Sequence, residues 1–82
     1  MYTQQQFGKE LKEKIRQKKS AAEIGAWAHA TYYEYLSQMD LDFGEFLLQL
    51  GSMEMGPEFE RSYEELDQIA DKLIVGKEVK LQ

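Results

Sequence analysis

Few side chains in this sequence are of a type that performs catalysis or holds a metal ion. The 82 residues include one histidine, His29, and no cysteine, so neither a histidine-rich metal site nor a thiolate site can form. The segment 40–45 resembles the start of an EF-hand loop, but Glu45 and Gly51 occupy the positions that require glycine and glutamate. We therefore predict no catalytic, cofactor-binding or metal-binding residue, and a protein that is not an enzyme. His29 is expected to be a surface residue of a helix.

Motifs of other small helical proteins are also missing. Acyl carrier domains attach their prosthetic arm to a serine that leucine follows, and none of the four serines has that context: Ser20, Ser37, Ser52 and Ser62. A helix-turn-helix is disfavoured because residues 29–33 continue a helix where the turn belongs. The would-be recognition stretch carries Glu34 and no lysine or arginine, so it would repel a duplex.

The net charge of −5 is distributed unevenly along the chain. Residues 1–19 hold six basic residues against two acids, residues 20–67 hold eleven acids against Arg61 alone, and residues 68–82 are nearly neutral. An acidic middle segment favours a basic partner over nucleic acid. The alternative is that the basic first segment simply neutralises the acidic body.

Four segments have the periodicity and start signals of helices. In the first, over residues 4–18, Thr3 is the expected N-cap and three apolar residues recur at every fourth position: Phe7, Leu11 and Ile15. The second begins at a capping box formed by Ser20 and Glu23 and extends to about Gln38. Its predicted core face comprises Ile24, Trp27, Ala28, Thr31 and Tyr35. Tyr33 lies on the opposite side and is expected to face solvent.

The third helix is predicted to begin at Asp42, with Glu45 in a capping role, and to end near Gly51 or Met53. Its apolar residues are Phe43, Phe46, Leu47 and Leu50. Proline cannot continue a helix, so the segment 56–57 separates the third helix from the fourth.

The fourth helix begins at a second capping box, formed by Ser62 and Glu65, and Gly76 is expected to end it. Its apolar residues follow one helical face: Leu66, Ile69, Ala70, Leu73 and Ile74. These elements predict an all-α fold, a compact single-domain bundle of four helices over residues 1–82. We expect order over about residues 3–76 and a short C-terminal tail at 77–82.

The sequence also predicts where the protein resides. No apolar run approaches the roughly 18 residues of a membrane span, and the start of the chain is polar rather than typical of a signal peptide. The absence of cysteine fits a reducing compartment. We therefore expect a cytoplasmic protein that does not enter a membrane.

After these exclusions, the distinguishing feature is a belt of acids with aromatic residues near it, a mixture that suits a protein interface. The candidate partner-binding residues are Tyr33, Asp40, Asp42, Glu54, Glu58, Glu60, Tyr63 and Glu64. Their field would accelerate encounter with a basic protein. We expect a monomer or a weak homodimer, and nucleic acid is not expected as a partner.

The order of elements over residues 7–75 resembles that of small helical bacterial immunity proteins, of the colicin D-like and contact-dependent growth inhibition type. The resemblance lies in a Trp-Ala helix at 20–28, an acidic connection at 40–42, and the segments 46–50 and 59–66. It implies a cytoplasmic protein that binds a toxin's nuclease domain and occludes its active site. It carries over no individual binding residue.

Two functions from different classes follow. The first is a non-enzymatic immunity or antitoxin-like protein that occludes a basic toxin, a nuclease domain, through its acidic surface. The second is a small regulatory or phage-type protein that contacts nucleic acid or the transcription machinery through the basic segment 9–19, with Lys12, Lys14, Arg16 and Lys18 as the contacts. A structural homodimer ranks third and an enzyme last.

Overall fold

The computed structural model describes residues 2–56, 58 and 60–76, and it confirms the predicted all-α bundle of four helices. The elements in chain order are α1 (Gln4–Arg16), α2 (Ala21–Glu34), the 3₁₀ helix η1 (Leu36–Gln38), α3 (Leu41–Gly51), the 3₁₀ helix η2 (Ser52–Met55) and α4 (Tyr63–Ile74). No strand occurs among the described residues, and no helix among them is long and apolar enough to cross a membrane. The predicted tail at 77–82 lies outside this part of the chain.

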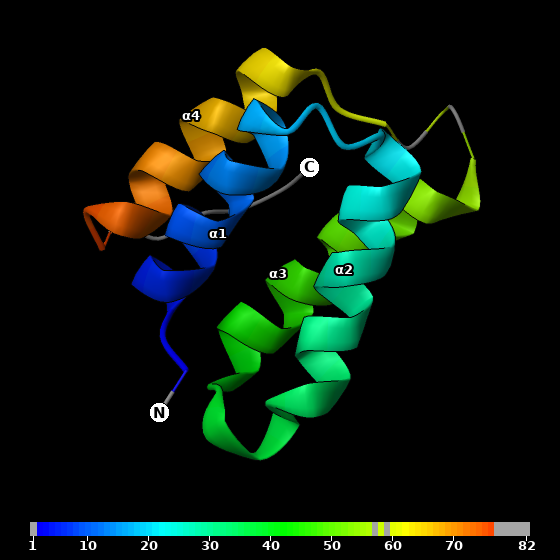
Figure 1. Ribbon diagram of the computed structural model, residues 1–82. Coiled ribbons are helices and arrows are strands. Elements are labelled where there is room, and N and C mark those ends of the chain that lie inside the picture. Colours follow the sequence, from blue (N-terminus) through cyan, green and yellow to red (C-terminus); the bar gives the residue numbers. More distant parts are fainter. Residues whose placement is uncertain (1, 57, 59, 77–82) are drawn as a thin grey trace.

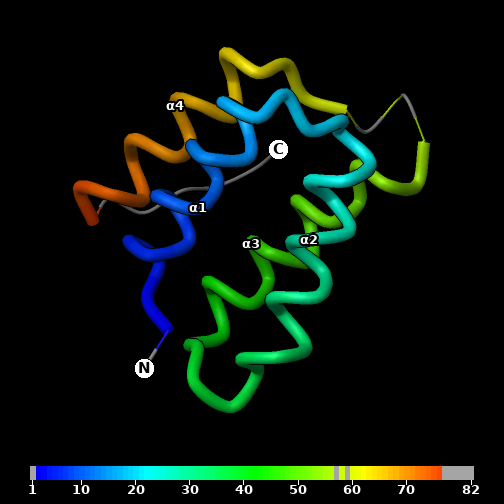
Figure 2. Tube along the Cα trace, in the orientation of Figure 1, coloured from blue at the N-terminus to red at the C-terminus, as the bar shows by residue number. Residues whose placement is uncertain are grey.

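The helices form two antiparallel pairs, with α1 beside α4 and α2 beside α3 (Figure 1). The chain leaves α1 and enters α2 at the end of the molecule where α4 begins (Figure 2). A hydrogen bond joins these segments, because the Tyr63 hydroxyl donates to the carbonyl oxygen of Lys19 at 2.6 Å. The α2–α3 pair therefore projects from this junction as a hairpin, and its turn lies at the far end.

Each α-helix begins at a residue whose side-chain oxygen accepts a backbone N–H from three residues further on. These N-caps are Thr3, Ser20, Asp40 and Ser62. Both predicted capping boxes are confirmed, because Glu23 and Glu65 accept the backbone N–H of their cap residues at 3.1 Å. Hydrogen bonds from these backbone N–H groups lower the pKa of both glutamates.

The predicted start of α3 was wrong by two residues. Asp40, not Asp42, is the N-cap, and its Oδ1 accepts the N–H of Phe43 at 2.8 Å. Either aspartate is a good cap by residue type, so the residue types alone do not distinguish the two helix starts. With Asp40 as the cap, Glu45 lies beyond the first turn and has no capping role.

Helices α1 and α2 end earlier than their periodicity predicts. α1 ends at Arg16, and Lys18 adopts φ +57°, a left-handed conformation that stops the helix. α2 ends at Glu34, and η1 replaces the last predicted turn. The side chain of Gln38 accepts the N–H of Tyr2 at 3.0 Å, so an interaction distant in sequence holds this tighter turn. After α4, Gly76 adopts φ +84°, as expected for a residue that ends a helix.

The core lies between the two helix pairs and centres on Phe7 of α1. Its ring stacks on Trp27 with the centroids 4.4 Å apart and meets Phe43 and Phe46 edge-on at 5.8 and 6.1 Å. The other large buried side chains include Leu11, Ile24, Leu47, Leu50, Met53, Leu66, Ile69 and Leu73. Each predicted stripe thus faces the core, and four of the predicted residues are only partly buried: Ile15, Trp27, Tyr35 and Ile74.

Helices α1 and α4 approach each other most closely at Gly8. A Cβ at this position would lie 2.9 Å from the carbonyl oxygen of Ala70 and 3.0 Å from side-chain carbons of Leu73 and Ile74. The glycine therefore sets the spacing of the pair.

Tyr2 belongs to the core although it precedes the first predicted helix. Its ring stacks on Tyr35 with the centroids 4.3 Å apart, and its hydroxyl donates to Glu10 at 3.1 Å. Burial, followed by the nearby Glu10 carboxylate, raises the pKa of Tyr2 well above its usual range. Tyr2 thereby joins the N-terminus to the turn that follows α2.

Candidate partner-binding surface

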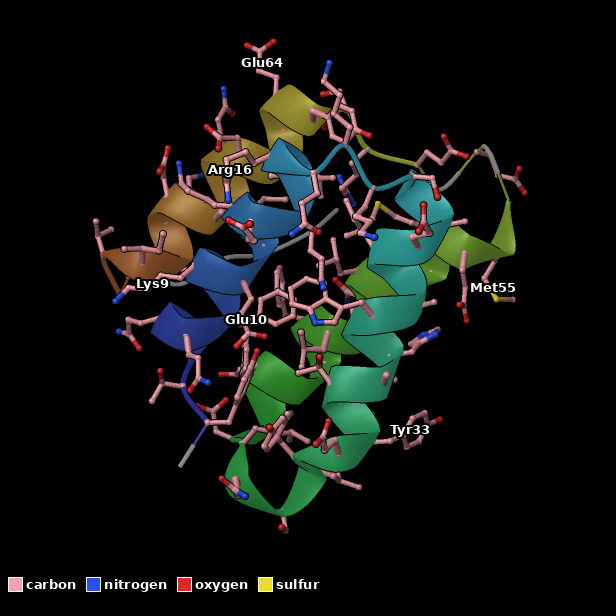
Figure 3. All side chains as sticks on the ribbon, viewed as in Figure 1. Lys9, Glu10, Arg16, Tyr33, Met55 and Glu64 are labelled. Carbon is pink, nitrogen blue, oxygen red and sulfur yellow. The ribbon has the colours of Figure 1, made fainter. Side chains whose placement is uncertain are left out.

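The eight residues predicted to bind a partner belong to three groups along the chain, the last two of which adjoin at Glu58 and Glu60. Tyr33 and the two aspartates, Asp40 and Asp42, lie where α2 turns into α3. Glu54 and Glu58 lie in and after η2. The last group stands at the start of α4: Glu60, Tyr63 and Glu64. Tyr33 and Glu64 point away from each other at distant positions (Figure 3), so these two residues do not lie side by side.

Two of these residues make contacts that join separate elements of the fold. The Tyr63 hydroxyl bonds to Lys19, as described above, so this side chain joins the start of α4 to the connection between α1 and α2. Glu54 lies 2.8 Å from Nδ1 of His29. Both residues therefore help to position neighbouring elements.

His29 differs from the surface residue that the sequence predicts. The structure places it half-buried between α2 and η2, with its ring directly over the backbone of Gly51. A Cβ at Gly51 would overlap the ring. This contact, together with Gly25 packed against the backbone of Gly51 and Glu54, holds α2 close to the end of α3.

The charges of the two helix pairs differ. The hairpin from α2 through η2, residues 21–56, contains six acids and neither lysine nor arginine. These acids are Glu23, Glu34, Asp40, Asp42, Glu45 and Glu54. The α1–α4 pair contains both signs and partly neutralises itself, because Lys12 forms ion pairs with Asp67 at 3.0 Å and with Asp71 at 2.6 Å. Hydrogen bonds to Asp71 and Asp67 raise the pKa of Lys12.

Much of the exposed apolar surface lies on the same acidic hairpin. Of the seven large hydrophobic residues that are exposed in the described part of the chain, five lie between α2 and η2: Tyr33, Leu36, Leu41, Leu48 and Met55. Tyr33 is 71% exposed, Leu41 85% and Leu48 39%, which are high values for side chains of this size. An apolar and acidic surface of this kind is typical of an interaction site.

Four exposed residues of this hairpin concern us further, and we call them the hairpin face: Tyr33, Leu41, Glu45 and Leu48. The last three form a stripe on α3, because they are separated by four and three residues. Tyr33 is four residues after His29, and Leu48 is three residues before Gly51. Because His29 packs over Gly51 and the two helices are antiparallel, Tyr33 and Leu48 lie at the same level of the hairpin. The hairpin face therefore includes residues from both helices.

Sequence reasoning identified Tyr33 but missed the other three residues of the hairpin face. Glu45 was assigned to a cap, which Asp40 and Phe43 form instead. Leu41 and Leu48 were not singled out. Their spacing of seven residues places Leu41 and Leu48 on one face of the helix, and this face differs from the one that the core residues of α3 occupy. That spacing is the sequence signal for a second apolar face.

The basic first helix has few cations without a partner in the structure. Lys12 is paired with α4, Arg16 pairs with Glu13 of its own helix, and the ammonium of Lys14 lies 5.4 Å from the centroid of the Trp27 ring. Three of the four residues predicted to contact nucleic acid are thus engaged within the chain. In the described residues, no group of three histidine or acidic side chains is arranged to hold a metal ion.

Comparison of the chain with protein-family models, with curated proteins and with solved structures finds no match.

Proposed function

We propose that this protein is a non-enzymatic inhibitor of the immunity or antitoxin type, which binds a basic toxin domain and covers its active site. The observation that carries the proposal is the sorting of charge and apolar surface between the two helix pairs. The hairpin over residues 21–56 has six acids, no lysine or arginine, and most of the exposed large hydrophobic side chains among the described residues. Surfaces that combine acids with rigid aromatic and aliphatic residues bind basic proteins.

The mechanism is steric and electrostatic occlusion. A nuclease binds the phosphates of its substrate with lysine and arginine side chains. Acidic groups of the hairpin occupy the same positions and attract the toxin over distances of about a Debye length, roughly 8 Å at physiological ionic strength. The proposal places the protein in the cytoplasm, where such a nuclease meets its substrate.

The distribution of charge favours a protein partner over nucleic acid. Phosphate contacts dominate the affinity of nucleic-acid binding, and they need cations that are free to meet the backbone. In this chain Lys12, Lys14 and Arg16 already contact acids or an aromatic ring within the fold. The regulatory role through the basic first helix is therefore the weaker proposal.

Co-expression tests the proposed function. The chain is expressed together with the product of each gene adjacent to its own that is toxic to cells, and cell survival is compared with expression of that toxin alone. Survival of the cells, co-purification of the two proteins and a nanomolar dissociation constant support inhibition by direct binding. Death of the cells at the same rate, with or without the chain, contradicts the proposal.

A further inference from the structure

We infer that the hairpin face, formed by Tyr33, Leu41, Glu45 and Leu48, is the docking surface, and that its occupant is a basic amphipathic helix of the partner. The inference rests on the proposed function, whose partner it describes in more detail. It names the face that binds and the chemistry that this face recognises.

The apolar residues of the hairpin face remain largely exposed, although the Tyr33 ring meets Tyr32 edge-on with the centroids 5.2 Å apart. Leu41 is the first residue of α3 and is 85% exposed, although a polar residue at this position would serve the helix equally well. Tyr33 projects from α2 into solvent (Figure 3). Large side chains exposed together on one face are typical of an interaction site.

The spacing of these residues matches that of a helix. Leu41 and Leu48 are seven residues apart, so they lie about 10 Å apart along the axis of α3. An amphipathic helix repeats its apolar residues at i, i+3, i+4 and i+7, and this repeat also spans about 10 Å. A partner helix that lies along the hairpin can therefore contact both leucines, and Tyr33 beside them, with a single apolar stripe.

The charges around the face require the polar side of that helix to be basic. Glu45 lies between the two leucines, Asp40 and Asp42 lie at the turn of the hairpin, and Glu54 lies toward its other end. The hairpin contains no lysine or arginine that could neutralise them. Lysine or arginine residues flanking the apolar stripe of the partner would pair with these acids.

A second copy of the chain fits this face poorly. A symmetric dimer places the same patch on both subunits, so the acidic hairpin faces would meet each other. Glu45 of one copy would then approach like charges. Of the cations of α1, Lys12 and Arg16 already pair with acids of their own chain and Lys14 lies over the Trp27 ring, so few remain for a head-to-tail contact.

The test is a titration of the ¹⁵N-labelled protein with a synthetic amphipathic helical peptide of leucine and lysine. Binding is monitored in ¹⁵N–¹H correlation spectra. Two control peptides have the same length: one keeps the lysines and replaces each leucine with serine, and the other replaces each lysine with glutamate. We expect saturable binding of the first peptide alone, with the largest shift changes at Tyr33, Leu41, Glu45 and Leu48. No binding, equal binding of the lysine–serine peptide, or shifts centred on the start of α4 overturns the inference.

Matched variants locate the contact. Leu41→Ser and Glu45→Lys each alter an exposed side chain and are expected to weaken binding of the leucine–lysine peptide at least tenfold. Glu64→Lys, an equal charge reversal at an exposed position in the first turn of α4, is expected to change it less than twofold. Circular dichroism confirms that each variant is folded. If Glu45→Lys and Glu64→Lys weaken binding of the peptide equally, the inference is overturned, because general electrostatic attraction to an acidic protein then explains the binding.

The same variants separate this inference from the proposed function. If Leu41→Ser and Glu45→Lys still protect cells from the toxin as well as the unaltered chain does, the function stands and the docking face is elsewhere. If the peptide binds the hairpin face but the chain protects from no toxin, the face stands and the function fails.

Discussion

Replacing Gly8 with alanine tests the close packing of α1 on α4. By helix propensity alone, the substitution stabilises the protein by about 1 kcal/mol, since alanine loses less backbone entropy than glycine. In this structure, however, the new Cβ meets the carbonyl oxygen of Ala70 at 2.9 Å and carbons of Leu73 and Ile74 at 3.0 Å. Carbon atoms pack best at about 3.5–4.0 Å. The added methyl group is therefore too close to three atoms of α4.

The magnitude follows from which atoms must move. The contact with Ala70 is to the backbone, so a rotamer change does not relieve it and the helices must separate by roughly half an ångström. Overpacking a core costs about 1–3 kcal/mol, and a clash with backbone belongs in the upper half of that range. After the gain in propensity, we expect Gly8→Ala to lower the free energy of unfolding by about 1–2 kcal/mol. The melting temperature should fall by roughly 4–8 °C for each kcal/mol.

Urea unfolding followed by circular dichroism measures this change. Lys9→Ala is the matched control, because Lys9 is the next residue of α1 and is exposed. We expect the control to alter the free energy of unfolding by no more than about 0.5 kcal/mol. A Gly8→Ala protein more stable than the unaltered chain would refute the packing argument, since propensity alone would then account for the result.

Three further predictions concern other contacts. Gly51→Ala should lower the free energy of unfolding, because the new Cβ overlaps the ring of His29. In a double-mutant cycle, adding His29→Ala should recover most of that loss, and additive losses from the two substitutions would contradict the predicted overlap. Asp40→Ala should lower the free energy of unfolding by about 1 kcal/mol and Asp42→Ala by less, in the same urea titration; the reverse order would restore Asp42 as the cap. Because burial raises the pKa of Tyr2 above its ordinary value of 10.0, the stability that its neutral phenol contributes is complete below about pH 10 and is lost as the pH rises further. Tyr2→Phe should reduce this alkaline loss in pH-dependent melting curves, and an undiminished loss would assign it to another group.

The parts of the fold that the sequence predicts correctly are those set by neighbouring residues. The capping boxes at Ser20 and Ser62 are read from four consecutive positions, and both form as expected. Tyr2 could not be predicted in the same way, because it is buried against Tyr35 and bonded to Gln38, more than thirty residues away. Local patterns contain no information about such contacts.

The candidate site was less predictable than the fold for a similar reason. The sequence displays every acid, but it does not show that Lys12 neutralises Asp67 or that Glu54 lies against His29. The lack of lysine and arginine between residues 20 and 60 is visible in the sequence. The exposure of Leu41 in the same acidic segment depends on how α3 packs. Only the structure shows that packing.

The central claim is that the acidic hairpin, rather than the acids near α4, binds a basic toxin. The most direct test is the dissociation constant of the complex with the toxin identified by the co-expression test, measured for two double charge reversals. One is Asp42→Lys with Glu45→Lys on the hairpin, and the other is Glu60→Lys with Glu64→Lys at the start of α4. We predict that the hairpin variant binds at least a hundredfold more weakly than the unaltered chain, whereas the α4 variant binds within about threefold of it. Equal weakening in both variants, or a larger loss in the α4 variant, would contradict the account.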